Sequence, residues 1–131
     1  MILAGRHYSL KMIGIGTDIV EINRVSRAVA SEHFTRRVFT DTEIKYCKSR
    51  GKSSAASYAA RFAAKEAFFK ALGTGIVTAL KEVEVRNNSL GKPEIFISGA
   101  TKNLADEKGV TEIFLSLSHS HEYATAVVVL E

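Results

Sequence analysis

The stretch that decides the fold runs from residue 61 to residue 75 and reads Arg61-Phe62-Ala63-Ala64-Lys65-Glu66-Ala67-Phe68-Phe69-Lys70-Ala71-Leu72-Gly73-Thr74-Gly75. Helix-favouring residues fill it up to Leu72, and Gly73 follows at the position where a left-handed backbone often ends a helix. Because an α-helix turns every ~3.6 residues, Phe62, Phe69 and Leu72 share an apolar stripe. The stretch therefore predicts the last turns of a long helix that packs in the core.

Glu66 and Lys70 are four residues apart and share another face of this helix. A carboxylate and an ammonium displayed together are what a site for a metal-bound phosphate group needs. The same spacing is also typical of an ordinary helix-stabilising pair, worth only ~0.3–0.5 kcal/mol. The pair alone leaves both interpretations open.

Length and composition indicate one domain with a core. The chain has 131 residues, 46% of them apolar, with a mean hydropathy of +0.02. It contains no apolar run long enough to predict a transmembrane span. Its single cysteine, Cys47, excludes an internal disulfide framework and a cysteine-rich metal site. We expect a cytoplasmic protein without a membrane partner.

Residues 1–11 precede a second methionine, Met12. They lack the apolar segment of a secretory signal. They are an N-terminal extension, or they come from an alternative start or from cloning. We therefore expect the domain to span residues 12–131.

The charge is unevenly distributed along the chain. The formal net charge is +4, and residues 22–52 alone carry eight basic against three acidic residues, which leaves +5 there. Such a segment indicates an acidic partner. Because no nucleic-acid-binding signature accompanies it, we expect no nucleic-acid partner.

The first predicted strand covers residues 12–20 and ends in Asp18. Its glycines, Gly14 and Gly16, indicate close approach of another backbone or a ligand. They do not form a dinucleotide-binding loop, because Ile19 stands where that motif needs its third glycine.

Helices and strands alternate along the rest of the chain. We predict a helix over residues 21–31 with Arg24 and Arg27 facing outward. A capping box from Thr40 to Glu43 begins a second helix, which runs to about Arg50. Ser53 or Ser54 caps the long helix. A hairpin over residues 83–97, a helix over 100–108 and strands over 113–119 and 123–130 follow. This order predicts an α+β single domain, with a mainly antiparallel sheet packed against a long central helix and shorter helices.

Asp18, Glu66, Lys70 and His119 are the candidate chemical residues. Asp18 is either a turn residue or a ligand, and His119 is more often structural than catalytic. If the strand carrying Asp18 lies against the long helix, Asp18 and Glu66 supply two oxygen ligands of the kind Mg²⁺ takes when it shares its shell with a phosphate. Lys70 would then neutralise phosphate charge.

Two motifs together resemble a known family. Ile13-Gly14-Ile15-Gly16-Thr17-Asp18-Ile19, with the helix of residues 61–75 carrying Glu66 some 48 residues after Asp18, is similar to the two-part signature of the 4′-phosphopantetheinyl transferases. The short chain, the turn containing Gly91-Lys92-Pro93 and the strand Ser116-Leu117-Ser118-His119 resemble the small holo-acyl-carrier-protein synthase type. The resemblance covers residues 12–131.

The resemblance implies the 4′-phosphopantetheinyl transferase fold and a reaction. The phosphopantetheine arm of coenzyme A passes to a serine of an apo acyl-carrier protein, adenosine 3′,5′-bisphosphate is released, and fatty acid biosynthesis is supported. Asp18 and Glu66 bind Mg²⁺ as the cofactor, Glu66 also helps to deprotonate the serine, and Lys70 stabilises the departing phosphate. The resemblance also implies a homotrimer with shared active sites, to which the final strand contributes.

Further residues follow from the same resemblance. Those expected to bind coenzyme A are Arg61, Lys65, Gly73, Lys92, Pro93 and His119. The arginine-bearing helix, with Arg24, Arg27 and the nearby Phe34, would dock the acidic carrier protein. Solvated arginines on a helix are the ordinary alternative.

Two other functions compete with this one. A non-catalytic basic adaptor would bind an acidic protein or nucleic acid through residues 22–52 and would not respond to coenzyme A. A different Mg²⁺-dependent phosphohydrolase would turn over nucleotide without an acceptor protein.

Overall fold

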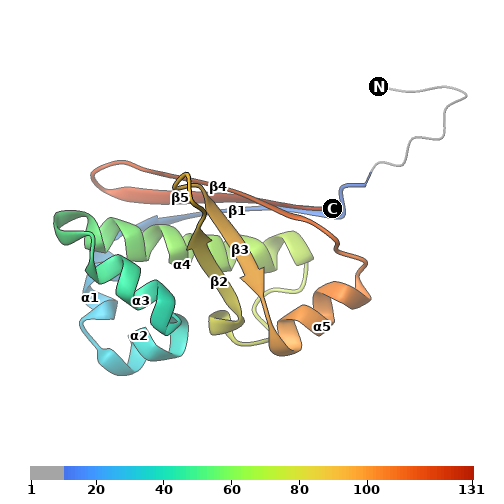
Figure 1. The fold of residues 1–131 in the computed structure, drawn as a ribbon, viewed down its shortest axis with the longest axis horizontal. Helices are drawn as coiled ribbons and strands as arrows, with labels where there is room; N and C mark the ends of the chain where they lie inside the picture. Colours follow the sequence, from blue (N-terminus) through green and yellow to red (C-terminus); the bar gives the residue numbers. More distant parts are fainter. Residues whose placement is uncertain (1–10) are drawn as a thin grey trace, which may run out of the picture.

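The long helix α4 (Ser54–Leu72) lies at the centre of the fold, and the other elements surround it (Figure 1). The structure is a computed structural model that describes residues 11–131. Residues 1–10 of the predicted N-terminal extension lie outside the described residues.

A three-stranded antiparallel sheet covers one side of α4. Its strand order is β1-β5-β4, with β1 at Gly14–Glu21, β4 at Ile113–His119 and β5 at Tyr123–Leu130. Figure 1 shows the three strands running along the helix above it. The predicted bounds of the last two strands are confirmed. The first strand begins at Gly14 and continues to Glu21, so Asp18 lies within it rather than at its end.

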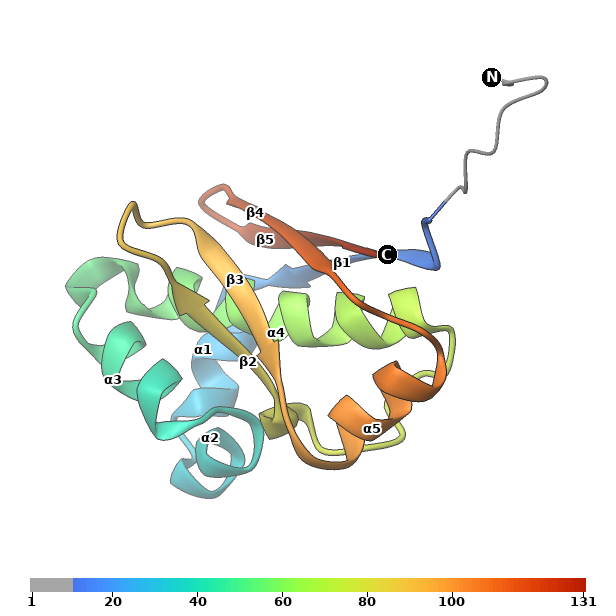
Figure 2. The same cartoon turned by 45° about the vertical axis from the view of Figure 1, so that its right-hand side comes forward.

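A separate two-stranded hairpin crosses α4 from another side (Figure 2). It consists of β2 (Val83–Asn87) and β3 (Pro93–Ile97), which pair antiparallel. A short 3₁₀ helix, Leu80–Glu82, leads into β2. The predicted hairpin is thus confirmed.

Short helices stand at the two ends of α4 (Figure 1): α1 (Ile22–Val29), α2 (Glu32–Val38) and α3 (Asp41–Lys48) at one end, α5 (Gly99–Glu107) at the other. The sequence interpretation missed α2, whose amino end is capped by the Ser31 hydroxyl. The capping box at the start of α3 is confirmed, but α3 ends at Lys48, before the predicted Arg50.

The two ends of α4 differ from each other. Gly73 has the left-handed backbone predicted for it, with φ of 79°. The predicted position of the serine cap is confirmed, because Ser53 is the N-cap residue of α4, but its side chain caps no amide in the described chain. A 3₁₀ turn, Gly51–Ser53, runs directly into α4. Within this turn the backbone amide of Ser53 donates to the Arg50 carbonyl oxygen.

Two glycines bring β1 into contact with the backbone of α4. A Cβ on Gly14 would lie 1.9 Å from the Ala71 carbonyl oxygen, and one on Gly16 would lie 2.1 Å from that of Ala67. The expected close approach of another backbone is therefore confirmed. Because side chains alternate along a strand, Asp18 points toward the same helix as these glycines.

Most of α4 is buried by the sheet, the hairpin and the short helices. The alanines in its second half, with Phe68 and Phe69, form the centre of the larger core cluster, together with Val83, Val85 and Val128. Despite the length of α4, none of the helices among residues 11–131 combines the length and apolarity that crossing a bilayer requires.

Candidate functional site

Asp18 brings a half-satisfied carboxylate to the face of α4. Its Oδ1 accepts a hydrogen bond from Lys70 Nζ at 3.1 Å. Its Oδ2 is buried and has no hydrogen-bond partner among residues 11–131. The Asp18 side chain is 12% exposed, whereas that of Lys70 is 55% exposed. An unpartnered buried carboxylate oxygen is costly, which indicates a ligand position.

Glu66 faces the same cavity as Asp18. The two line a cavity of about 560 Å³, which we call the carboxylate cavity. Burial and then the Asp18 charge raise the pKa of Glu66, against the opposing charges of Lys70 and Arg24. The predicted convergence of Asp18 and Glu66 is therefore what the fold produces: β1 supplies one carboxylate and α4 the other.

The donor set fits a divalent cation such as Mg²⁺. A cation between the two carboxylates would remove their repulsion and give Asp18 Oδ2 a partner. Mg²⁺ binds oxygen ligands and usually keeps several waters, so one or two protein carboxylates suffice. Within residues 11–131 no group of three or more His, Cys, Asp or Glu side chains is arranged to hold a metal. Asp18 and Glu66, which line the cavity from β1 and α4, are the residues that would hold such a cation.

The carboxylate cavity opens toward the basic segment of the chain. Arg24 and Phe34 line it, and the Phe34 ring lies 6.3 Å from that of Phe62, which lines it as well. Arg27 is exposed on the same helix as Arg24 but does not line this cavity. The structure thus brings two of the predicted partner-binding residues to the candidate site.

Three of the predicted coenzyme A residues meet in another depression, of about 310 Å³, which we call the arginine pocket. Arg61, Pro93 and His119 line it. Arg61 Nη2 donates to Asn87 Oδ1 at 2.6 Å, and its guanidinium lies 4.1 Å from the centre of the Tyr46 ring. Its Nε is buried and has no partner within the described chain. The pocket therefore offers cationic and ring groups, which suit a phosphate and a base.

The other predicted coenzyme A residues do not join this pocket. Lys92 is exposed in the hairpin turn beside Pro93. Gly73 ends α4 twelve residues after Arg61, about 18 Å along the helix axis at ~1.5 Å per residue. Lys65 is fully buried, with its ammonium 2.8 Å from Glu43 Oε1. The prediction that Lys65 contacts coenzyme A disagrees with this position, because the ammonium is enclosed by protein acceptors.

Sequence reasoning missed several residues of the two sites. Tyr46 on α3 and Arg50, two residues after the end of α3, line the arginine pocket together with Asn87. Their four-residue spacing in a segment predicted to be helical was an available signal. Asn87 was interpreted only as a turn residue, and Glu43 only as part of a capping box, because local patterns fully explained both.

Comparisons with known proteins show the family of the chain. The sequence profile described as the 4′-phosphopantetheinyl transferase superfamily matches residues 14–128. A holo-[acyl-carrier-protein] synthase of Ruminiclostridium cellulolyticum is 48% identical over 120 residues, which cover 88% of this chain and 90% of that protein.

Solved structures show the same fold. The crystal structure of holo-[acyl-carrier-protein] synthase from Neisseria meningitidis has a TM-score of 0.84 and 37% identity, covering 92% of this chain and 98% of that one. The Bacillus anthracis synthase in complex with CoA (3′,5′-ADP) has a TM-score of 0.76 and 38% identity, covering 91% and 96%.

The chain therefore belongs to the 4′-phosphopantetheinyl transferase superfamily. Within that superfamily it is an enzyme of the holo-[acyl-carrier-protein] synthase type. Its α+β fold, with antiparallel sheets and a long helix, is the fold of its solved neighbours.

Proposed function

We propose that this enzyme transfers the 4′-phosphopantetheine group of coenzyme A to a serine of an apo acyl-carrier protein. The reaction depends on Mg²⁺, releases adenosine 3′,5′-bisphosphate, takes place in the cytoplasm and supplies fatty acid biosynthesis. The catalytic domain comprises residues 12–131. The observation that carries the proposal is the shared carboxylate cavity, in which Asp18 has an unpartnered oxygen and Glu66 has a raised pKa.

Asp18 and Glu66 hold the cation in this proposal. When bound, Mg²⁺ neutralises charge on the pyrophosphate of coenzyme A. Glu66, directly or through water, accepts the proton of the serine hydroxyl, and its raised pKa makes it a stronger base than an ordinary glutamate. The serine oxygen bonds to the phosphorus of the pantetheine phosphate as the bond to the leaving adenosine 3′,5′-bisphosphate breaks.

Lys70 stabilises the leaving phosphate. Its ammonium is bound to Asp18, yet the side chain is 55% exposed and free to turn toward a ligand. Positioning and charge neutralisation supply most of the acceleration in phosphoryl transfer, so a single mobile ammonium next to the cation is valuable.

The arginine pocket binds the nucleotide end of coenzyme A. Arg61, Pro93 and His119 supply its walls, and the exposed Lys92 adds positive charge nearby. The complex of the Bacillus anthracis synthase with CoA (3′,5′-ADP) supports a nucleotide site in this type of enzyme. We leave Lys65 and Gly73 out of the proposed set because of their positions.

The functional assembly is a homotrimer. The outer face of the three-stranded sheet exposes the apolar side chains of Ile15, Ile19, Phe114 and Val127. Exposed apolar side chains on one face favour contact with another protein surface. Neighbouring copies packed on it would join the arginine pocket of one chain to the carboxylate cavity of the next.

We expect Phe114→Glu to disrupt this assembly, because it places a charge on this face of the sheet at a residue that lines neither pocket. Light scattering should give a smaller particle than the wild type, with a parallel loss of transfer. Val77→Glu is the matched control, since Val77 is 61% exposed and lines neither pocket. A trimeric Phe114→Glu enzyme, or a wild type that is monomeric, would contradict the proposed interface.

Arg24→Glu should weaken carrier docking more than chemistry. Reversing a charge at the rim of the carboxylate cavity repels an acidic partner, so the KM for the carrier should rise more than kcat falls. The difference from wild type should shrink at high salt. Lys108→Glu makes the same charge change at the end of α5 and should leave the KM for the carrier unchanged. Equal effects of the two variants would argue against docking at Arg24.

The transfer reaction itself is tested by incubating the enzyme with coenzyme A, Mg²⁺ and an apo carrier protein. The intact mass of the carrier should increase by one phosphopantetheine group. Hydrolysis of coenzyme A without an acceptor would identify a phosphohydrolase instead. Carrier binding without any mass change would identify an adaptor.

A further inference from the structure

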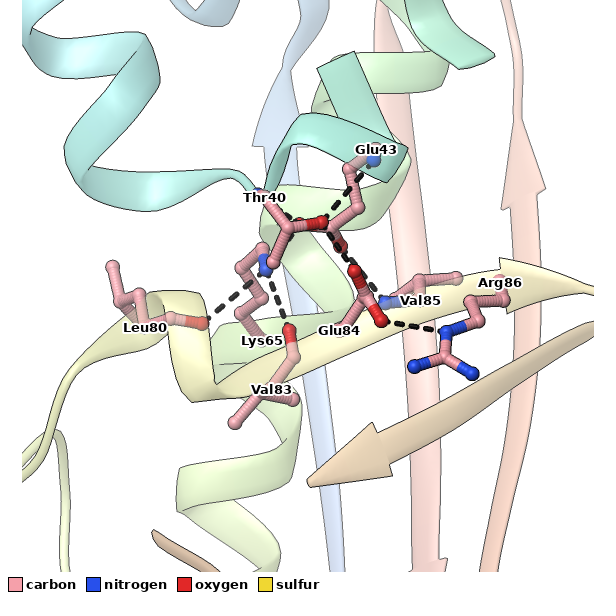
Figure 3. A network of polar contacts seen from close by, with 8 residues as sticks. All are labelled: Thr40, Glu43, Lys65, Leu80, Val83, Glu84, Val85 and Arg86. Carbon is pink, nitrogen blue, oxygen red and sulfur yellow. Dashed lines mark hydrogen bonds and ion pairs between the residues drawn. The ribbon is translucent and has the colours of Figure 1, made fainter. Parts of the chain in front are cut away.

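A buried ion pair, Glu43 with Lys65, joins α3, α4 and β2 (Figure 3). Both side chains are fully buried. Lys65 Nζ donates to Glu43 Oε1 at 2.8 Å, to the Val83 carbonyl oxygen at 2.5 Å and to the Leu80 carbonyl oxygen at 3.2 Å. Each proton of the ammonium therefore has an acceptor.

The Glu43 carboxylate is held as completely as the ammonium. Its Oε1 also accepts from the Thr40 amide at 2.9 Å, and its Oε2 accepts from the Val85 amide at 2.8 Å. The Thr40 hydroxyl donates in turn to Glu84, as Figure 3 shows. The start of α3 and the middle of β2 are thus bound to one side chain.

Stability alone is a weak reason for such a pair. Apolar side chains of similar volume often stabilise a core as well as, or better than, a buried ion pair. This pair differs from an isolated ion pair because Lys65 also binds carbonyl oxygens of β2 and of the 3₁₀ helix before it. These acceptors fix the position of Lys65, and therefore the position of α4 against the hairpin.

Lys65 of the pair is on the same helix as Arg61, which lines the arginine pocket. Arg61 lies one helical turn before Lys65 and binds Asn87 at the far end of β2, while Lys65 binds Val83 at its start. The pocket has one wall from α4, through Arg61, and another from the hairpin, through Asn87 and Pro93. The relative placement of α4 and the hairpin therefore determines the width of the pocket.

We propose that Glu43 and Lys65 are positioning residues that set the arginine pocket to the dimensions of the coenzyme A nucleotide. The inference rests on the proposed function, which assigns that ligand to the pocket. The role is geometric. The charges that shift the pKa of Glu66 are those of Asp18, Lys70 and Arg24, and Lys65 is not one of them.

Glu43→Gln tests this role at nearly constant volume. An amide cannot accept from both the Val85 and Thr40 amides and from Lys65 as the carboxylate does, so the hairpin should shift. Because displacements of ~1 Å can cost up to about 10²-fold, we expect the KM for coenzyme A and the Kd for adenosine 3′,5′-bisphosphate to rise about tenfold. The kcat at saturating coenzyme A and the KM for the carrier should stay within about twofold, because Glu66 and Arg24 remain in place.

Cys47→Ala is the matched control. It removes another fully buried side chain from α3. This variant should lower the melting temperature without changing either nucleotide constant. If Glu43→Gln fails to fold, Glu43→Asp, which keeps the charge and shortens the reach, is judged by the same measurements.

Each outcome decides the inference. A folded variant with wild-type nucleotide constants, a loss confined to kcat, or an equal nucleotide defect in Cys47→Ala would overturn the positioning role. Calorimetric titration of adenosine 3′,5′-bisphosphate requires no turnover, so it separates this failure from a failure of the proposed function. A wild type that binds the nucleotide but transfers nothing would refute the function alone.

Discussion

Glu66→Gln is expected to lower the rate of phosphopantetheine transfer by about 10²–10⁴-fold, the range for loss of a general base. The change keeps the shape of the side chain but removes the carboxylate that pairs with Asp18 in the carboxylate cavity. It therefore removes both the proposed base and one of the proposed cation ligands. The rate is measured as mass gain of an apo carrier protein with coenzyme A and Mg²⁺.

The stability of the same variant distinguishes a lost site from a lost fold. The pKa of Glu66 is raised above its unfolded value by burial and by Asp18. The folded state therefore binds the proton more tightly, and the stability that this contributes is present at low pH and lost as pH rises through the folded pKa. Without metal, Glu66→Gln should gain stability relative to wild type as the pH rises above the ordinary pKa of a glutamate. If Glu66→Gln were instead less stable than wild type at every pH, we would attribute its inactivity to unfolding.

Gly16→Ala is expected to cost both stability and activity. The new Cβ would lie 2.1 Å from the Ala67 carbonyl oxygen, so β1 must move away from α4. Overpacking of this kind typically costs about 1–3 kcal/mol, and more where backbone has to shift. Because Asp18 lies two residues further along the same strand, its carboxylate should move away from Glu66. Denaturant unfolding and the transfer assay measure the two losses.

Gly109→Ala is the control for this change. Gly109 ends α5 with φ of 81° and open space around it, so the substitution strains only the local backbone. It should reduce stability moderately and leave transfer unchanged. Wild-type transfer in Gly16→Ala would show that the spacing of β1 and α4 does not control the site.

The elements carrying the carboxylate cavity could be predicted from the sequence because their signals are local. Gly73 marks the end of α4, and Gly14 and Gly16 indicate the close approach that the structure confirms. Alternation along a strand then places Asp18 on the side of α4. The convergence of Asp18 and Glu66 followed from these patterns together with the family resemblance.

Long-range polar contacts could not be predicted in the same way. Glu43 satisfies the capping-box pattern completely, so nothing local indicates that its carboxylate also binds Lys65 and Val85. Lys65 looks like a surface residue beside Glu66, yet the packing of β2 over α4 encloses it. The helix α2 was missed because it is short and carries arginines where a core-facing stripe would be expected.

The most direct test is a calorimetric titration of Mg²⁺, in the presence of coenzyme A, into the wild type, Asp18→Asn, Glu66→Gln and the double variant. If the two carboxylates share one cation, each single substitution should abolish most of the binding, and the double variant should lose little more. Wild-type Mg²⁺ affinity in either folded single variant would contradict the shared site.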